Sequence, residues 1–375
     1  MEAHGRITKL LEAGVKEQIF PGAVALVKVR GVTRYHAAVG LASLVPSQHP
    51  ADPTTLYDLA SLTKPLATTS ALLTLVEEKR LHLDQSVESL LHPCAGAPVG
   101  QVTIRDLLSH RSGLPAWRPY YQRMTCSDHP FPNKEEENRT KSQYLAWIIQ
   151  EPLEYPCGTQ CLYSDLGFIL LGLIIEHLTQ QSLADYCQQR LFGPLGADPL
   201  LFPTQQHPSL KTRFAPQDIA PTEQDPWRQR LLHGEVDDAN AYALGSVAGH
   251  AGLFGTAAAV AVMTGAWLNG WLRRNAGFDR ALVQEFVTRS QKESVGSWAL
   301  GWDTPSMPSS SGTRLSSKAF GHLGFTGTSI WIDPVQELEM ILLTNRVHPS
   351  RENTKIRPFR PLFHDVVFEE VIGKR

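Results

Sequence analysis

Segments with strand patterns lie at opposite ends of this chain of 375 residues. Residues 22–29 predict a strand, Arg30 and Gly31 a turn, and residues 33–39 a second strand. A two-stranded hairpin is only marginally stable by itself. The C-terminal third supplies further strand patterns at residues 298–302, 319–321, 328–332 and 338–344. We therefore predict that the two ends of the chain join in one antiparallel sheet.

The middle of the chain carries mostly helical patterns, for example over residues 66–79 and 166–178. The charged run at residues 134–139 is predicted to belong to a solvated loop, residues 116–142. The fold class is thus α+β, an antiparallel sheet flanked by helices with a mostly helical second lobe. Residues 1–59 with 241–375 are expected to form the sheet domain and residues 60–240 the helical domain, with the active site between them.

The charge balance and the apolar runs exclude several classes of function. The formal net charge is -2, so we expect no nucleic-acid partner and no binding to an anionic membrane. The longest apolar run, residues 167–175, is too short to span a bilayer. The polar start, residues 1–6, lacks the apolar core of a secretory signal, which predicts a cytoplasmic protein. The five scattered cysteines suit free thiols in a reducing compartment rather than a metal site.

A serine and a lysine three residues apart begin the first apolar helix of the middle region, as Ser61-x-x-Lys64. Pro65 is tolerated only in the first turn of a helix, which favours a helix that begins at Ser61. The two side chains then share one face. A partly desolvated lysine can activate a serine for attack on a carbonyl carbon. The alternative is a serine that caps a helix, followed by a solvated lysine.

Tyr163-Ser164-Asp165 comes directly before the helix predicted at residues 166–178, and Ser164 or Asp165 suits its N-cap. A tyrosine next to a lysine ammonium is expected to have a lowered pKa, so Tyr163 is a candidate base. The alternative is a tyrosine that packs its ring on the core. His110, which precedes a turn, is expected to tie that loop by a hydrogen bond rather than to act as a base.

A glycine-containing segment, residues 321–328, lies between two of the C-terminal strands. Glycines there allow the backbone to come close to a ligand. A strand edge beside a helix N-terminus can offer two N–H groups to one oxygen, which is an oxyanion hole. A plain turn between strands is the alternative reading of this segment.

Ser61-x-x-Lys64, Tyr163-Ser164-Asp165 and His322-Leu323-Gly324 together resemble the motifs of the serine β-lactamase and penicillin-binding D,D-peptidase superfamily. The chain is most similar to the class C β-lactamase branch, which includes related carboxylesterases. The resemblance extends from about residue 21 to residue 353. It implies a β-lactamase/transpeptidase-like fold and a serine hydrolase without a metal or an organic cofactor.

The resemblance also implies a role for each matching position. Ser61 would be the nucleophile and Lys64 its proton partner. Tyr163 would help to activate the serine and to protonate the leaving group. The backbone N–H groups of Ser61 and Phe325 would form the oxyanion hole, and His322 would take the place of the family's third-motif lysine.

Two positions depart from the family pattern. His322 replaces a lysine that would favour a substrate carboxylate, and a histidine is only partly charged near neutral pH. Asp165 replaces an asparagine, and as a carboxylate it accepts hydrogen bonds and is able to pair with Lys64. Asp165, His322 and Gly324 are the expected substrate-binding positions. Arg346 is a further candidate, because its guanidinium suits an anionic substrate end, although it suits a solubility role equally.

We therefore expect a serine hydrolase that cleaves an ester or amide bond through an acyl-enzyme on Ser61. Its partner would be a small-molecule ester, amide or peptide substrate. The alternatives are a β-lactamase or a D-alanyl-D-alanine carboxypeptidase. A further alternative is a non-catalytic scaffold or ligand sensor with this fold, which would have no need of Ser61, Lys64 and Tyr163 together. The sequence leaves the oligomeric state open.

Overall fold

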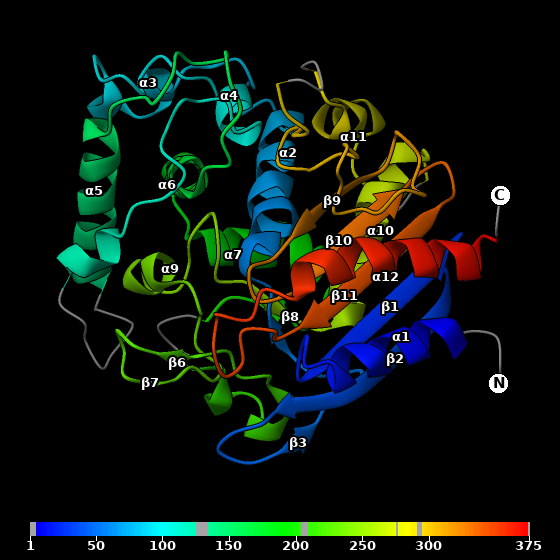
Figure 1. Cartoon of the computed structure of the whole chain (residues 1–375). Helices are drawn as coiled ribbons and strands as arrows, with labels where there is room; N and C mark the ends of the chain where they lie inside the picture. Colours follow the sequence, from blue (N-terminus) through cyan, green and yellow to red (C-terminus); the bar gives the residue numbers. More distant parts are fainter. Residues whose placement is uncertain (1–4, 125–133, 204–208, 275–276, 291–294, 374–375) are drawn as a thin grey trace.

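The computed structural model describes residues 5–124, 134–203, 209–274, 277–290 and 295–373 (Figure 1). Its main feature is a six-stranded sheet in the order β3-β2-β1-β11-β10-β9. The predicted union of the two chain ends is confirmed, because β1 pairs antiparallel with β2 on one side and with β11 on the other. The strands are β1 (Gly22–Val29), β2 (Val32–Ser43), β3 (His49–Pro50), β9 (Phe320–Leu323), β10 (Ser329–Asp333) and β11 (Leu338–Thr344).

Alternating side chains along β1 contribute to two separate hydrophobic clusters. Val24 and Leu26 belong to one cluster, whereas Ala25 and Val27 belong to another on the opposite face of the sheet. The second cluster also contains apolar residues of the N- and C-terminal helices, α1 (Gly5–Lys16) and α12 (Ile356–Val371). Figure 1 shows these two helices side by side over that face. β1 is therefore apolar on both faces, as a strand covered on both sides must be.

The larger cluster lies on the other face of the sheet. It includes residues of α2 (Ser70–Glu77), α6 (Asp165–Thr179) and α10 (Ala257–Trp271) as well as inward-facing residues of β1 and β11. One continuous hydrophobic cluster thus crosses both predicted domain boundaries. The division at residues 59 and 240 stays a prediction, while the α+β arrangement of a sheet flanked by helices is confirmed.

Two local predictions are wrong. Residues 298–302 do not form a strand; Trp298 and Asp303 make only an isolated bridge, because the two are joined by a tight turn. The charged run that begins at Lys134 is not a loop but the first turns of α5 (Lys134–Gln150). Three glutamates in its first turn are favoured by the positive end of the helix dipole. Residues 125–133 of the predicted loop lie outside the described part of the chain.

The segment that begins with Ser61 is helical but not a regular α-helix. It starts as a 3₁₀ turn (Ala60–Leu62), continues as a π-helical stretch (Lys64–Thr69) and becomes α-helical only in α2. Every residue from Leu62 to Leu73 is buried. A π-helical stretch changes the direction in which side chains point, and such irregularities are frequent at functional sites. The segment enters the core directly behind Ser61.

The remaining elements are short or belong to the helical region. The helices are α3 (Val87–Leu90), α4 (Ile104–Leu108), α7 (Leu183–Cys187), α8 (Gly193–Leu195), α9 (Ala239–Ala243) and α11 (Arg280–Val287). The strands are β4 (Tyr57–Asp58), β5 (Leu200–Leu201), β6 (Gln224–Asp225), β7 (Arg230–Leu231) and β8 (Phe254–Gly255). Within the described residues, no single helix is long and apolar enough to cross a membrane; one bent pair, Asp165–Thr179 with Leu183–Leu195, meets that test by length and composition.

Candidate active site

Ser61 lies on a turn that several hydrogen bonds hold in place. The carboxylate of Asp58 accepts the N–H of Ala60 at 2.8 Å and the N–H of Asp237 at 2.7 Å. Ala60 itself has a φ of +48°, a conformation that costs free energy for a residue with a side chain. The surrounding hydrogen bonds must offset this strain. Their combined effect is to present Ser61, which is half-buried, at the wall of a cavity.

The ammonium group of Lys64 is fully buried beside the serine. Its Nζ lies 3.0 Å from Ser61 Oγ, 2.7 Å from Asp165 Oδ1 and 3.1 Å from the carbonyl oxygen of His250. A lysine ammonium has three donors, and here each has one acceptor. The geometry excludes the alternative of a solvated lysine. The predicted pairing of Asp165 with Lys64 is confirmed.

The protonation state of Lys64 depends on its neighbours as well as on burial. Burial by itself lowers the pKa of Lys64, but the Asp165 carboxylate and the Tyr163 phenol outweigh it, and the net pKa is raised. The lysine ammonium expected from the sequence is therefore the resting state, although the group is fully buried and not only partly desolvated. The reason is Asp165, since a carboxylate at 2.7 Å stabilises the charged form more than burial destabilises it.

Tyr163 lies close to both of these side chains. Lys64 Nζ is 4.8 Å from the centre of the tyrosine ring, and the phenol interacts with the side chains of Lys64 and Ser61. The expected fall in its pKa is wrong: burial raises the pKa of Tyr163, and Lys64 offsets only part of that rise. At rest the phenol is neutral and the lysine is charged.

His110 helps to hold Tyr163 in position, as predicted for a structural histidine. Its Nδ1 accepts the N–H of Ser164 at 3.0 Å, and its ring lies 4.5 Å from the ring of Tyr163. Burial and the Lys64 charge hold the pKa of His110 well below its usual value. Ser164 caps α6 by accepting the N–H of Gly167, as the sequence predicted. The tyrosine is thus held between a buried histidine and a capped helix.

His322 is buried on β9 and is neutral. Its Nδ1 is 2.7 Å from the carbonyl oxygen of Leu323, and its ring centre is 6.0 Å from that of Tyr163. Burial and the Lys64 charge lower the pKa of His322 to about 3. The partial positive charge expected from a histidine near its ordinary pKa is therefore absent. The site therefore has the positive charge of Lys64 beside the serine, whereas the third motif contributes the neutral ring of His322.

The turn from β9 to β10 packs against the segment before Ser61, and its Phe325 lines the same cavity as the serine. A Cβ at Gly324 would collide with the side chain of Thr328 and lie 2.6 Å from the carbonyl oxygen of Leu59, so only glycine fits. Thr326 Oγ1 donates to the carbonyl oxygen of Asp58 at 2.8 Å, which ties this turn to the segment before Ser61. Within the described residues the N–H of Phe325 donates to no group. It is available for a substrate oxygen.

Arg346 mainly supports this turn, and little of its guanidinium is left to bind a substrate. Its Nε donates to the carbonyl oxygen of Phe325 at 2.9 Å, and its Nη1 donates to those of Arg351 and Asn353. The guanidinium also lies 4.4 Å from the Phe325 ring. Only Nη2 has no hydrogen-bond partner among the described residues. Arg346 lines the cavity, but its main contacts position Phe325.

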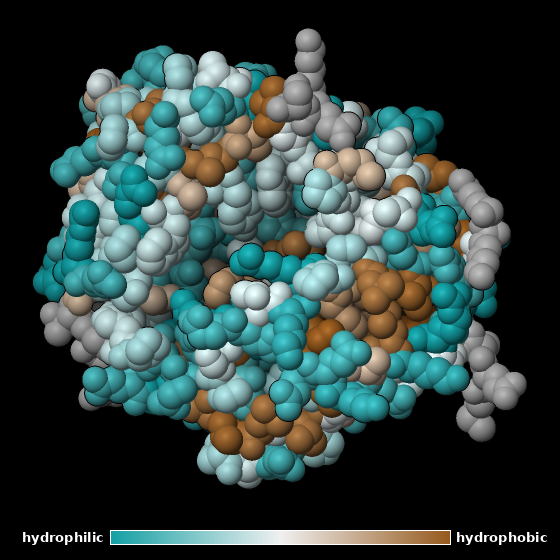
Figure 2. All heavy atoms as spheres, viewed as in Figure 1, coloured by the Kyte–Doolittle hydropathy of each residue, from teal (hydrophilic) through white to brown (hydrophobic). Residues whose placement is uncertain are grey.

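These groups meet at a cavity of about 980 Å³. Figure 2 shows that this face of the molecule is hollowed between the helical region and the side of α12. The cavity wall includes Ser61, Tyr163, Asp165, His322, Gly324, Phe325 and Arg346. A volume of this size holds a ligand considerably larger than a simple acetyl ester. Within the described residues, no group of three or more histidine, cysteine, aspartate or glutamate side chains is placed to hold a metal ion.

Several residues of the site carry no recognisable sequence motif. Asp58 precedes Ser61 by three residues, and its carboxylate bridges two distant segments. His250 supplies a backbone carbonyl to Lys64 and an Nε2 contact of 2.9 Å to Asp238. An aromatic group on the cavity wall comes from two separate segments of the chain and consists of Trp117, Tyr121 and Trp227. The position of Asp58, three residues before Ser61, was only a weak indication in the sequence that it belongs to the site. The other residues of this group are recognised only in the tertiary structure.

We expect ester hydrolysis to accelerate as the pH rises from about 6 to 9. If Ser61 is the nucleophile, its attack requires the Lys64–Tyr163 pair to have lost one proton. The pKa values of both groups are raised, so this form becomes more populated at higher pH. Log kcat/KM should rise with a slope near 1, measured with an ester stable over this range.

The control is a His322→Gln variant, which should show the same pH profile because the pKa of His322 is about 3 and the ring is already neutral. A profile with an inflection near pH 6.5 that disappears in this variant would contradict the neutral histidine. A flat profile from pH 6 to 9 would contradict the protonated pair.

Known proteins resemble this chain in sequence and in fold. A family model described as Beta-lactamase matches residues 7–362. A protein of Escherichia coli (strain K12) named "Putative D-alanyl-D-alanine carboxypeptidase" is 36% identical over 319 residues, which cover 78% of this chain and 70% of that protein. The solved structure of EstCE1, "a hydrolase with promiscuous acyltransferase activity", has a TM-score of 0.75 at 21% identity and covers 97% of this chain and 98% of its own. A class C beta lactamase structure has a TM-score of 0.73 at 18% identity, with 98% and 97% covered.

Proposed function

Because this chain belongs to the β-lactamase family of serine hydrolases, we propose that Ser61 is its nucleophile and that it cleaves an ester or amide bond through an acyl-enzyme. The observation that carries this proposal is the position of Lys64 Nζ, 3.0 Å from Ser61 Oγ and held there by Asp165. A solvated lysine would not be held in this geometry. Ser61 and Phe325 line the same cavity, and Lys64 is buried next to the serine.

The first half of the reaction follows from these positions. Once the Lys64–Tyr163 pair has lost a proton, it takes the hydroxyl proton of Ser61 while Oγ bonds to the substrate carbonyl carbon. The N–H groups of Ser61 and Phe325 then stabilise the negative oxygen of the tetrahedral intermediate. The intermediate collapses, the bond to the leaving group breaks, and the pair returns the proton to that group. The product of this half is an ester on Ser61.

The second half repeats the sequence with water. Water replaces the leaving group in the cavity, gives its proton to the same pair and bonds to the acyl carbon. Collapse of the second intermediate releases the acid and restores the Ser61 hydroxyl. Asp165 keeps Lys64 in place throughout, since its carboxylate and the His250 carbonyl fix two of the three ammonium protons.

The substrate class we propose is a small ester or amide. His322 is neutral, so the third motif offers no fixed cation for a substrate carboxylate. A peptide that ends in D-alanine is the second candidate, because Arg346, Arg351 and Arg357 also line the cavity. The name of the Escherichia coli relative supports that candidate. Only substrate comparison separates the two.

The test combines a covalent probe with a substrate panel. We expect intact-mass spectrometry after treatment with a fluorophosphonate to show one adduct, and peptide mapping to place it on Ser61. A panel of p-nitrophenyl esters, nitrocefin and D-Ala-D-Ala peptides, compared by kcat/KM, then ranks the substrate classes. No adduct with any acylating probe and no turnover in the panel would instead favour a scaffold or a ligand sensor with this fold.

A further inference from the structure

The cavity is much larger than the site of bond cleavage, and one part of its wall combines a carboxylate with aromatic rings. That part consists of Asp238, Trp117, Tyr121 and Trp227, which we call the acidic aromatic wall. Asp238 is the N-cap of α9. Trp117 and Trp227 come from two loops, and Tyr121 from the short 3₁₀ helix Tyr120–Arg123.

The rings of this wall contact one another, and Tyr121 is hydrogen-bonded to the helix that Asp238 caps. The ring centre of Tyr121 lies 4.8 Å from that of Trp227 and 6.3 Å from that of Trp117. Asn240, two residues after Asp238 on α9, accepts the N–H of Tyr121 at 3.0 Å. The aromatic group and the carboxylate therefore belong to one rigid corner of the cavity. Trp117 is 42% exposed, a large apolar surface to leave open in a cavity wall.

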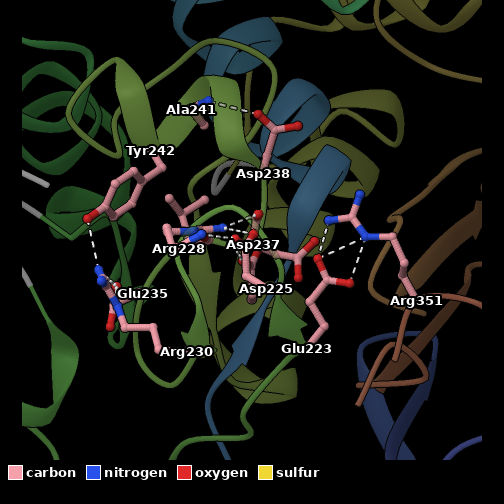
Figure 3. A network of polar contacts seen from close by, with 12 residues as sticks. Glu223, Asp225, Arg228, Arg230, Glu235, Asp237, Asp238, Ala241, Tyr242 and Arg351 are labelled. Atoms are coloured by element: carbon pink, nitrogen blue, oxygen red, sulfur yellow. Dashed lines mark hydrogen bonds and ion pairs between the residues drawn. The ribbon is translucent and has the colours of Figure 1, made fainter. Parts of the chain in front are cut away.

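Asp238 keeps an unused acceptor in this corner. Its Oδ1 accepts the N–H of Ala241 at 2.7 Å and contacts His250 Nε2 at 2.9 Å. Its Oδ2 has no hydrogen-bond partner among the described residues. Although burial alone would raise it, the His250 contact and the helix N–H hold the pKa of Asp238 at about 2, so the group is ionised. Figure 3 shows its carboxylate pointing away from the arginine network.

Arg228 and Arg230, which follow Trp227 in the chain, already have partners. Arg228 is buried, pairs with Asp225 and donates to the carbonyl oxygens of Val236 and Asp237 (Figure 3). Arg230 pairs with Glu235 and donates to the Tyr242 hydroxyl. A second buried acceptor is open beside them, since Oδ1 of Asp237, which also lines the cavity, has no hydrogen-bond partner within the described chain.

We propose that the acidic aromatic wall is a subsite for an ammonium group on the substrate, and thus that the enzyme prefers esters or amides with a cationic substituent some distance from the reacting carbonyl. An ammonium group forms a strong, charge-assisted hydrogen bond with a carboxylate. It is also attracted to the faces of Trp and Tyr rings, which a neutral alkyl group of the same shape is not. This inference rests on the proposed function, and it names the substrate class of the same site.

The test uses a pair of substrates that differ only in this charge. p-Nitrophenyl 6-aminohexanoate carries an ammonium group where p-nitrophenyl heptanoate carries a methyl group. We expect kcat/KM to favour the cationic ester on the order of tenfold, and this ratio to fall to near 1 in Asp238→Asn. Asparagine retains the oxygen that caps α9, so the variant removes the charge and keeps the cap.

The matched control is Asp279→Asn. Asp279 caps α11 in the same way, with its Oδ1 accepting the N–H of Leu282 at 3.0 Å, and it does not line the large cavity. It should leave the ratio unchanged. Trp227→Ala should reduce the ratio, but the cationic ester should remain the better substrate. Asp238 also lies near Lys64, so its replacement is able to lower the rate with every substrate. The readout is therefore the ratio of the kcat/KM values of the two esters, in which a general loss of rate cancels.

A preference that is missing in the unaltered enzyme, or that survives in Asp238→Asn, would overturn the subsite. If neither ester is hydrolysed, the proposed function fails, and the subsite is then judged by binding alone. Calorimetry with 6-aminohexanamide and heptanamide should still show tighter binding of the cation, and equal affinities would overturn the subsite independently of catalysis.

Discussion

Replacing Ser61 by alanine is expected to reduce ester turnover by at least about a thousandfold, as loss of the nucleophile does in other serine hydrolases. Ser61 Oγ is the hydroxyl that lies 3.0 Å from the buried ammonium, and Ser61 lines the cavity, so we expect no other side chain to replace it. The measurement is kcat with a p-nitrophenyl ester, corrected for spontaneous hydrolysis. The fluorophosphonate adduct should disappear in the same variant.

The fold should survive this change, because Ser61 is half-buried and alanine suits a helical turn. Circular dichroism and the melting temperature check that point. Ser47→Ala, in an exposed loop, is the control and should retain both turnover and the adduct. Wild-type turnover in a folded Ser61→Ala protein would remove the serine from the mechanism and, with it, the proposed acyl-enzyme.

Replacing Lys64 by methionine or Tyr163 by phenylalanine is expected to lower kcat/KM by at least about a hundredfold each, the range for acid–base groups. The two side chains interact with Ser61 and with each other, and together they hold the proton that the reaction moves. The double variant should therefore lose little more than either single variant, because groups that act as a unit are not additive. Strict additivity of the two losses would contradict a shared proton.

Two control variants separate catalysis from stability. Lys141 is also a largely buried lysine between two carboxylates, with Nζ 2.6 Å from Glu137 and 2.8 Å from Glu176, but it lies outside the cavity. Lys141→Met should destabilise the protein and leave kcat of the folded fraction unchanged. Tyr186→Phe removes a hydroxyl that lies 3.1 Å from Thr74, again outside the cavity, and should also leave kcat unchanged. If Lys64→Met resembles Lys141→Met, Lys64 is structural.

The sequence predicted the sheet and the three motifs because their signals are local. Apolar strands at both ends need partners, and the hairpin of β1 and β2 has its missing neighbour in β11. Ser164 was recognisable as a helix cap from the residues that follow it. The charged run at Lys134 was misread, because three successive glutamates suit both a solvated loop and the first turn of a helix. A local pattern does not separate those two cases.

The sequence by itself determined which side chains are available for chemistry, their order, and the helix and strand patterns that carry them. The tertiary structure alone decided their protonation. Asp165 lies 101 positions after Lys64 in the chain, yet its carboxylate raises the pKa of that lysine above the value that burial would give it. Burial in the same place raises the pKa of Tyr163 and lowers that of His322. Charge depends on desolvation and on neighbours from distant segments, and these exist only once the chain has folded.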